Sequence, residues 1–148
     1  PLFEYEAMLA VSNRHPLSQK TFIDPFDLAD QTLITYPVDR DRLDVFTQFL
    51  DPAGVDPAEI RNAELTPMMV QLVASGRGVA CLPNWALTEY LANELLTAKR
   101  LSENGLWGRL YAAVRREQLE DPFMQEFLST AISTCFNHLA GIKRIERA

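Results

Sequence analysis

The stretch that most constrains this chain runs over residues 65–83 and has the pattern of a strand end, a short helix, a tight turn and a buried strand. Thr66 can act as N-cap and accept a hydrogen bond from a first-turn N–H group, and Pro67 suits the first helical position, where its missing N–H costs nothing. Gly76 can take the left-handed conformation that ends a helix, and Gly78 allows a tight return. The apolar run that follows is typical of a parallel strand buried on both faces, so the stretch predicts half of an α/β layer.

Composition limits what the chain can be. Its 148 residues suffice for one domain or two small lobes, and a hydrophobic content of 47% can supply a sizeable core. A net charge of -6 and a pI near 4.9 argue against a nucleic-acid surface in these residues, because phosphate binding needs clustered Lys and Arg.

The cysteines and the chain ends bear on the cellular compartment. Cys81 and Cys135 lack the spacing of a metal site and are expected to be reduced residues of a cytosolic protein. No apolar run approaches the roughly 20 residues that a membrane span needs, and no signal-peptide pattern precedes the first strand. Because the chain opens on Pro1 and not on Met, it is expected to be an excised piece of a longer protein.

Strands and helices are expected to alternate through most of the chain. Asp39 or a neighbour can cap a helix in which Leu43, Phe46, Phe49 and Leu50 share one face. Alternating elements with short connections indicate a parallel or mixed sheet with helices on both faces. The expected strands are 5–12, 32–36, 60–65, 79–82 and 95–101, and helices or helical turns are expected at 25–30, from about 40 to 50, from Thr66, and at 84–93.

The C-terminal part raises a packing problem. Residues 107–116 form an expected strand, and Asp121 with Pro122 opens the longest expected helix. This helix carries an apolar stripe with Phe123 and Phe127, which needs a partner surface. Too few elements are available here to build a second lobe, so the rest of that lobe is expected before the first residue of the chain.

Residues 72–83 resemble a signature of LysR-type transcriptional regulators, Leu-Val-Ala-x-Gly-x-Gly-[Ile/Val]-x-x-Leu-Pro. Other landmarks agree in order, and the similarity covers nearly the whole chain. They are His15-Pro16-Leu17 after the first strand, the Asp27-Leu28-Ala29 turn, and Tyr36-Pro37. Three blocks of the sequence resemble, more narrowly, the branch of the family that regulates methionine biosynthesis. They are residues 33–38 with 42–45, residues 49–50 with 52–55, and residues 106–107 with 109–115.

The resemblance implies a fold and a domain plan. Family members have an N-terminal winged helix-turn-helix that binds DNA, a linker helix that dimerises, and an effector domain of two α/β lobes similar to type 2 periplasmic binding proteins. This chain would hold one complete lobe and part of the other, built on a mixed sheet flanked by helices. The expected parts are the second lobe at 3–101, a linker at 102–106, a strand and helix returning to the incomplete first lobe at 107–139, and a tail at 140–148 with a polar, frayed end.

The resemblance also implies a function. The chain would sense a small amino-acid effector, homocysteine, between the lobes, and would need no cofactor beyond this co-inducer. The full-length protein would be a cytoplasmic dimer or tetramer that binds DNA only through its N-terminal domain, without enzymatic activity or a membrane partner.

Ligands of open α/β sheets bind beyond the carboxyl ends of the strands. Here the free N–H groups after Thr66 can hold a carboxylate, and Asp39 or backbone carbonyls near Tyr36 can receive an ammonium. Met68 and Val38 can line the thiol chain. The expected effector-binding residues are Tyr36, Pro37, Val38, Asp39, Arg40, Thr66, Pro67 and Met68, with no catalytic and no metal-binding residue.

Each of these assignments has a structural alternative. Thr66 can cap its helix whether or not a ligand binds, Asp39 can serve only as a cap, and methionines such as Met68 are common core fillers. His15, in a loop before proline, fits a local hydrogen-bonding role better than a catalytic one.

Two other classes of function compete. A solute-binding protein of a transporter for a small amino acid would share the fold and the cleft, and a secretory signal in the complete gene would favour it over a regulator. An enzyme on the same scaffold is disfavoured, because no Ser/His/Asp or Cys/His set is placed together and His15 and His138 lie on separate elements.

Overall fold

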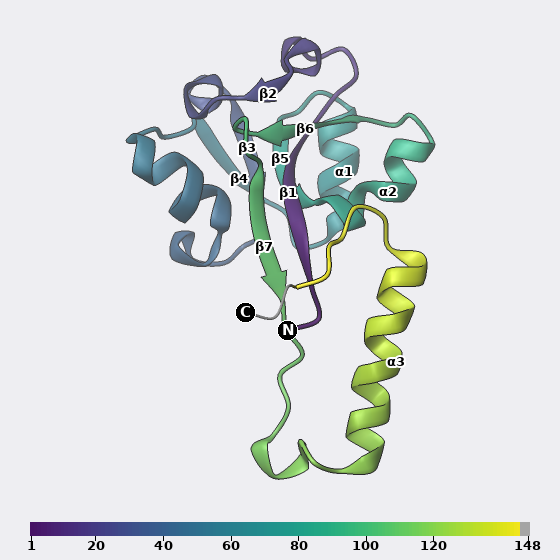
Figure 1. The fold of residues 1–148 in the computed structure, drawn as a ribbon. Helices are drawn as coiled ribbons and strands as arrows, with labels where there is room; N and C mark the ends of the chain where they lie inside the picture. The colour runs from purple at the N-terminus through teal and green to yellow at the C-terminus, as the bar shows by residue number, and fades with distance from the viewer. Residues whose placement is uncertain (146–148) are drawn as a thin grey trace.

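The structure, a computed structural model, describes residues 1–145 and is organised around a seven-stranded mixed sheet (Figure 1). The strand order is β2-β6-β1-β5-β3-β4, with β7 also paired to β1. The expected mixed α/β sheet with helices is confirmed. The strands are β1 (Phe3–Val11), β2 (Phe22–Ile23), β3 (Thr32–Thr35), β4 (Glu59–Asn62), β5 (Val79–Pro83), β6 (Thr97–Leu101) and β7 (Leu106–Leu110), and the α-helices are α1 (Thr66–Ala74), α2 (Asn84–Ala92) and α3 (Pro122–His138).

The sheet separates two layers of apolar side chains. Successive residues of β1 point to opposite faces, so Leu9 packs on one face and Ala10 on the other. The Leu9 face is covered by the short helical turns between β3 and β4, and the Ala10 face by α1 and α2. Helical residues therefore flank both faces, although the long helices of this core lie on one face only (Figure 1).

Strand β5 has neighbours of opposite direction. It runs parallel to β3 and antiparallel to β1, and Val79, Ala80 and Leu82 are buried. The expected buried strand is confirmed. The expected parallel pairing holds on one edge only, because β1 approaches β5 from the opposite direction.

Helix α1 ends at the glycine expected to end it, but its N-cap residue is not the expected one. Gly76 has a φ of +74° and ends the helix, and a Cβ on Gly78 would lie 2.6 Å from the Thr32 carbonyl oxygen. Leu65 occupies the N-cap position without a side-chain bond, so Thr66 is the first helical residue and not the cap. The Thr66 hydroxyl is instead hydrogen-bonded to Tyr36.

The helix expected after Asp39 is broken into short pieces: a 3-10 turn at Arg40–Arg42, a π-helix at Val45–Leu50 and a 3-10 turn at Asp51–Ala53. The π-helix closes with a bond from the Asp51 N–H to the Phe46 carbonyl, which widens the turn by one residue. The apolar face is still formed, because Phe46, Phe49 and Leu50 are buried. Asp39 occupies the N-cap position of the Arg40–Arg42 turn, as expected, but its side chain makes no capping bond.

Strands β6 and β7 follow each other along the same edge of β1, pairing with residues 8–11 and 3–7 respectively. The segment expected to be a linker is the turn between them. Two expected strands end early. β4 stops at Asn62, and β7 stops at Leu110 because β1 begins at Phe3 and offers no further partner.

Beyond β7 the chain leaves the sheet, and α3 projects away from the body of the molecule, with only its C-terminal end near it (Figure 1). No residue of α3 is buried, and Phe123 and Phe127 are each 61% exposed. The chain then returns, and Lys143 pairs with Glu4 of β1. The tail up to residue 145 is therefore anchored and not frayed, while 146–148 lie outside the described residues. None of the helices in the described range has the length and apolar character needed to cross a membrane.

Candidate functional site

The carboxyl ends of the parallel strands β3 and β4 lie side by side and bring two of the expected site residues together. Tyr36 follows β3 directly, and Thr66 begins α1 after β4. The Tyr36 hydroxyl lies 2.6 Å from the Thr66 Oγ1 atom, and both side chains are half-buried. A pair of linked hydroxyls, each with lone pairs left over, thus marks this edge of the sheet.

The start of α1 supplies further donors. The first N–H groups of a helix have no intrahelical acceptor, which here applies to Thr66 and Met68, since Pro67 has no N–H and the Met69 N–H binds the Leu65 carbonyl. No acidic residue in the first turn competes for these groups. The helix dipole stabilises an anion at this position by about 0.3 to 1 kcal/mol. The start of α1 can therefore hold a carboxylate.

Apolar surface surrounds this helix start. Val38 is 47% exposed and Met68 is 55% exposed. Met68 also lines a hollow of about 280 Å³, together with Leu65 and Leu72. Met68 is not the core filler of the structural alternative, a role that the fully buried Met69 fills.

The charged group of Arg40 is paired with two carboxylates, away from the Tyr36–Thr66 hydroxyl pair. Its guanidinium lies 2.5 Å from an Asp51 carboxylate oxygen and 2.7 Å from one of Asp56, and it stacks 4.2 Å above the Phe46 ring. Hydrogen bonds to Asp51 and then Asp56 raise the pKa of Arg40. Asp39 and Pro37 are exposed, and Asp39 contributes its backbone carbonyl to the turn that follows. The structure therefore joins Tyr36 with Thr66 but leaves Arg40 in its own ion-pair cluster.

The sequence reasoning missed residues at the same edge of the sheet. Asn62 accepts a hydrogen bond from Thr35 at 3.1 Å. Asn84 is the first residue of α2, where its Oδ1 accepts the Trp85 N–H at 2.9 Å and its Nδ2 donates to the Gly141 carbonyl at 2.8 Å. The position of Asn84 directly after a buried strand could have indicated that it lies at this edge of the sheet. No sequence signal indicates its contact with Gly141.

A second hollow, of about 510 Å³, lies at the opposite, amino end of β3 and includes His15 and Phe26. The His15 Nδ1 atom accepts the Leu17 N–H at 3.1 Å, and Nε2 lies 3.0 Å from the Gln31 side-chain amide oxygen, Oε1. The expected local hydrogen-bonding role of His15 is confirmed.

The next question is whether the cysteines or a cluster of metal-binding side chains could form a reactive site. Cys81 and Cys135 are free thiols, and burial, with a smaller effect of Asp44, raises the pKa of Cys81 to about 12. Within residues 1–145, no three His, Cys, Asp or Glu side chains are grouped so that they could hold a metal ion.

Comparison with known proteins places the chain in a family. Residues 1–135 match the family model of the LysR substrate binding domain. The transcriptional regulator MetR of Escherichia coli K12 is 43% identical over 147 residues, and that of Haemophilus influenzae is 39% identical over 142 residues. These alignments cover 99% and 96% of this chain but 46% of each relative, so the chain spans about half the length of the curated relatives it matches.

Solved structures agree with this result. The regulatory domain of MetR, a LysR family regulator from N. meningitidis, superposes with a TM-score of 0.91 at 36% identity, over 99% of this chain and 67% of that one. Reduced OxyR from N. meningitidis shares the fold, with a TM-score of 0.75 at 20% identity over 99% of this chain and 66% of that one. The chain thus belongs to the family of LysR substrate binding domains, the regulatory domains of LysR-type transcriptional regulators.

Proposed function

We propose that this chain is the main part of the effector-sensing domain of a LysR-type regulator of methionine biosynthesis, and that it binds homocysteine. The observation that carries the proposal is the Tyr36–Thr66 hydroxyl pair at the start of α1, on the carboxyl edge of the parallel strands. The relatives named MetR support the methionine assignment.

Each part of homocysteine has a counterpart at this edge. Its carboxylate would bind the N–H groups and hydroxyl of Thr66, at the positive end of the helix dipole. Its ammonium would lie against Asp39 or the carbonyls near Tyr36 and Pro37, and its thiol chain against Met68 and Val38. The pattern suits a small zwitterion with an apolar tail.

The effector would lie between this lobe and a first lobe that the longer protein supplies. Support comes from α3, which has no buried residue and presents Phe123 and Phe127 to solvent. In this division residues 3–101 are the second lobe, 102–106 a linker and 107–139 the return to the first lobe. Binding would then couple to an N-terminal winged helix-turn-helix in a cytoplasmic dimer or tetramer.

Calorimetric titration tests this proposal. L-homocysteine, with methionine and homoserine as controls, is titrated into this chain and into a version extended to the complete effector domain. We expect selective homocysteine binding by the extended version and weak or no binding by this chain. A properly folded extended version without a homocysteine response would overturn the methionine assignment.

A pair of matched variants tests the site itself. Thr66→Val removes the hydroxyl that contacts Tyr36, whereas Thr47→Val makes the same change at an exposed position whose hydroxyl lies 3.5 Å from the Leu43 carbonyl. In the extended domain we expect Thr66→Val to weaken homocysteine binding about three- to tenfold, the range of one neutral hydrogen bond. Thr47→Val should leave it unchanged, and equal effects of the two variants would remove Thr66 from the site.

A further inference from the structure

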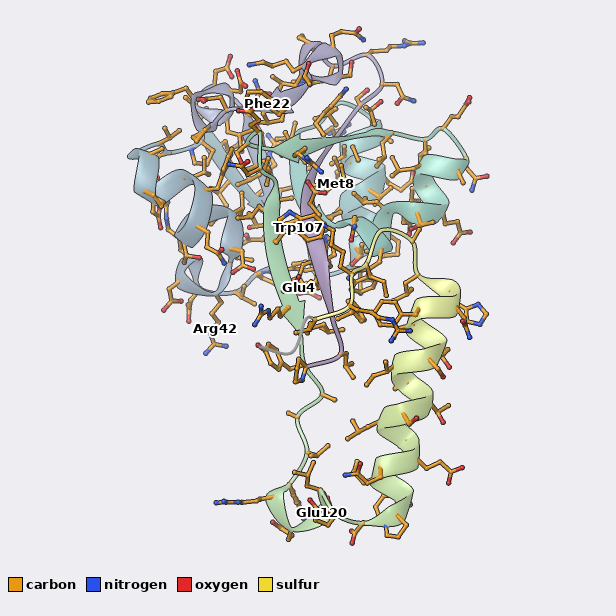
Figure 2. All side chains as sticks on the ribbon, viewed as in Figure 1. Glu4, Met8, Phe22, Arg42, Trp107 and Glu120 are labelled. Carbon is orange, nitrogen blue, oxygen red and sulfur yellow. The ribbon has the colours of Figure 1, made fainter. Side chains whose placement is uncertain are left out.

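The chain after α3 returns to the start of β1, beside the end of β7 (Figure 2), and we call residues 140–145 the strap. Lys143 exchanges both backbone hydrogen bonds with Glu4, at 2.9 and 3.0 Å. These bonds lie on the edge of β1 opposite β7, because Glu4 pairs with Arg109 on its other side. The strap is thus an added strand residue on the free edge of β1.

The strap also holds β7. The Lys143 ammonium lies 3.5 Å from the centre of the Trp107 ring, a cation–π contact across β1. Figure 2 shows Glu4 and Trp107 near each other on β1 and β7, where the strap passes. Beside them the Glu4 carboxylate accepts a bond from Arg109 at 2.9 Å. One lysine therefore ties together the two strands that lead out of this lobe.

The Asn84 side chain connects the strap to the edge of the sheet that carries the candidate site. Asn84 begins α2 directly after β5, and its Nδ2 donates to the Gly141 carbonyl at 2.8 Å. Gly141 has a φ of +76°, and a Cβ there would lie 2.5 Å from the Asn84 Nδ2 atom. The positive φ favours glycine here, and a Cβ would fit only if the Asn84 amide moved away.

We propose that Asn84 is a positioning residue that acts through Gly141: it fixes the strap against β1 and β7 and thereby sets how this lobe is oriented relative to the first lobe. The inference rests on the proposed function, in which the effector lies between the lobes. Its physical basis is that β1 and β7 both run out of the sheet toward the chain start and α3, so a change in their direction displaces the strap and strains the Asn84–Gly141 bond.

The test uses the full-length regulator that contains this chain. Asn84→Asp keeps the oxygen that accepts the Trp85 N–H but replaces the donor to Gly141 with an acceptor, and Gly141→Ala forces the strap away from the same amide. Lys143→Met removes the contact with Trp107 and leaves the backbone bridge in place. Thr88→Ala is the matched control within α2, because it removes a hydroxyl that contacts the Asn84 and Trp85 backbone carbonyls and leaves the Asn84 side-chain amide in place.

The first measurement needs no ligand. Spin labels at the exposed positions 89 and 126 report the distance between α2 and α3, and hydrogen exchange reports the Lys143 amide. We expect Asn84→Asp and Gly141→Ala to broaden the distance distribution and to speed exchange at Lys143, while Thr88→Ala changes neither. Wild-type distances and exchange in a folded Asn84→Asp protein would overturn the proposal, whatever the effector is.

The second measurement is the homocysteine dissociation constant. We expect Asn84→Asp and Gly141→Ala to shift it by the same factor, about two- to tenfold, and the double variant to shift it no further. An effect of Asn84→Asp that Gly141→Ala does not share would make Asn84 a direct ligand contact and overturn the positioning role. Absence of homocysteine binding by the wild type would overturn the proposed function, while the distance measurement still decides the role of the strap.

Discussion

Gly105 lies so close to Glu6 that a Cβ at position 105 would be 2.5 Å from the Glu6 Oε1 atom. Glu6 is a buried carboxylate on β1, and the Arg100 guanidinium binds it at 2.7 and 3.3 Å. The turn between β6 and β7 therefore passes directly over this ion pair, and a side chain at position 105 would have to displace the Glu6 carboxylate. Gly105 also has a φ of +76°, so both conformation and space select glycine.

Gly105→Ala should destabilise the protein more than Gly54→Ala. Gly54 has a φ of +67° with nothing within 4 Å of an added Cβ, so its substitution costs only the left-handed conformation, about 1 to 2 kcal/mol. Gly105→Ala adds the clash with Glu6. Urea unfolding of both variants measures the difference, and equal losses in free energy of unfolding would show that the Glu6 side chain moves freely.

Asp27 should contribute to stability in a pH-dependent way. Burial alone would raise its pKa, but the hydrogen bond from Lys20, the Asp24 N–H and the Lys20 charge together lower it below the ordinary value of 3.8. A carboxyl whose pKa is depressed on folding stabilises the fold above its unfolded pKa, and this contribution is lost as pH falls through the folded value. The loss is thus expected below about pH 4.

The measurement compares Tm for wild type and Asp27→Asn between about pH 6 and pH 3. We expect the difference between them to shrink as the pH falls. Lys20→Met should remove the same pH dependence, and the double variant should add nothing to either single change. A difference that stays constant over this range would contradict the assignment to Asp27.

The two thiols should react very differently. Both cysteine residues are half-buried, but desolvation of the Cys81 thiol raises its pKa to about 12, so almost no Cys81 thiolate is present near neutral pH. A thiol reagent such as N-ethylmaleimide should modify Cys135 in the folded chain and Cys81 only after denaturation. Mass spectrometry of the modified peptides locates the label, and rapid modification of folded Cys81 would contradict the desolvation of its thiol.

Local signals were enough to predict the α1–β5 unit. Pro67 and Gly76 set the ends of its helix through their own backbone preferences, and Gly78 allows the close approach to Thr32 on β3. The candidate site at Thr66 followed from the same local pattern. The cap was misplaced by one residue, because the hydroxyl of Thr66 is bound to Tyr36, a distant residue in sequence.

Features that depend on distant partners could not be predicted. The spacing of Phe46, Phe49 and Leu50 fits a regular helix and a broken one equally well. The end of β7 depends on where β1 begins, and the contact between Asn84 and Gly141 joins residues 57 positions apart. Neither is encoded in a local motif, and both belong to the strands and strap that leave this lobe.

The stripe on α3 makes the division into lobes testable. Phe127 is 61% exposed here, and Phe26, at the other end of the molecule, is 69% exposed, so Phe127→Ala and Phe26→Ala should both leave the unfolding free energy of this chain nearly unchanged. In a version extended to the full effector domain, Phe127 should be buried against the first lobe. Its replacement should then cost about 3 to 5 kcal/mol, while Phe26→Ala stays neutral. Denaturant unfolding of the extended variants checks this, and a Phe127→Ala variant as stable as its parent would mean that α3 does not pack on a first lobe.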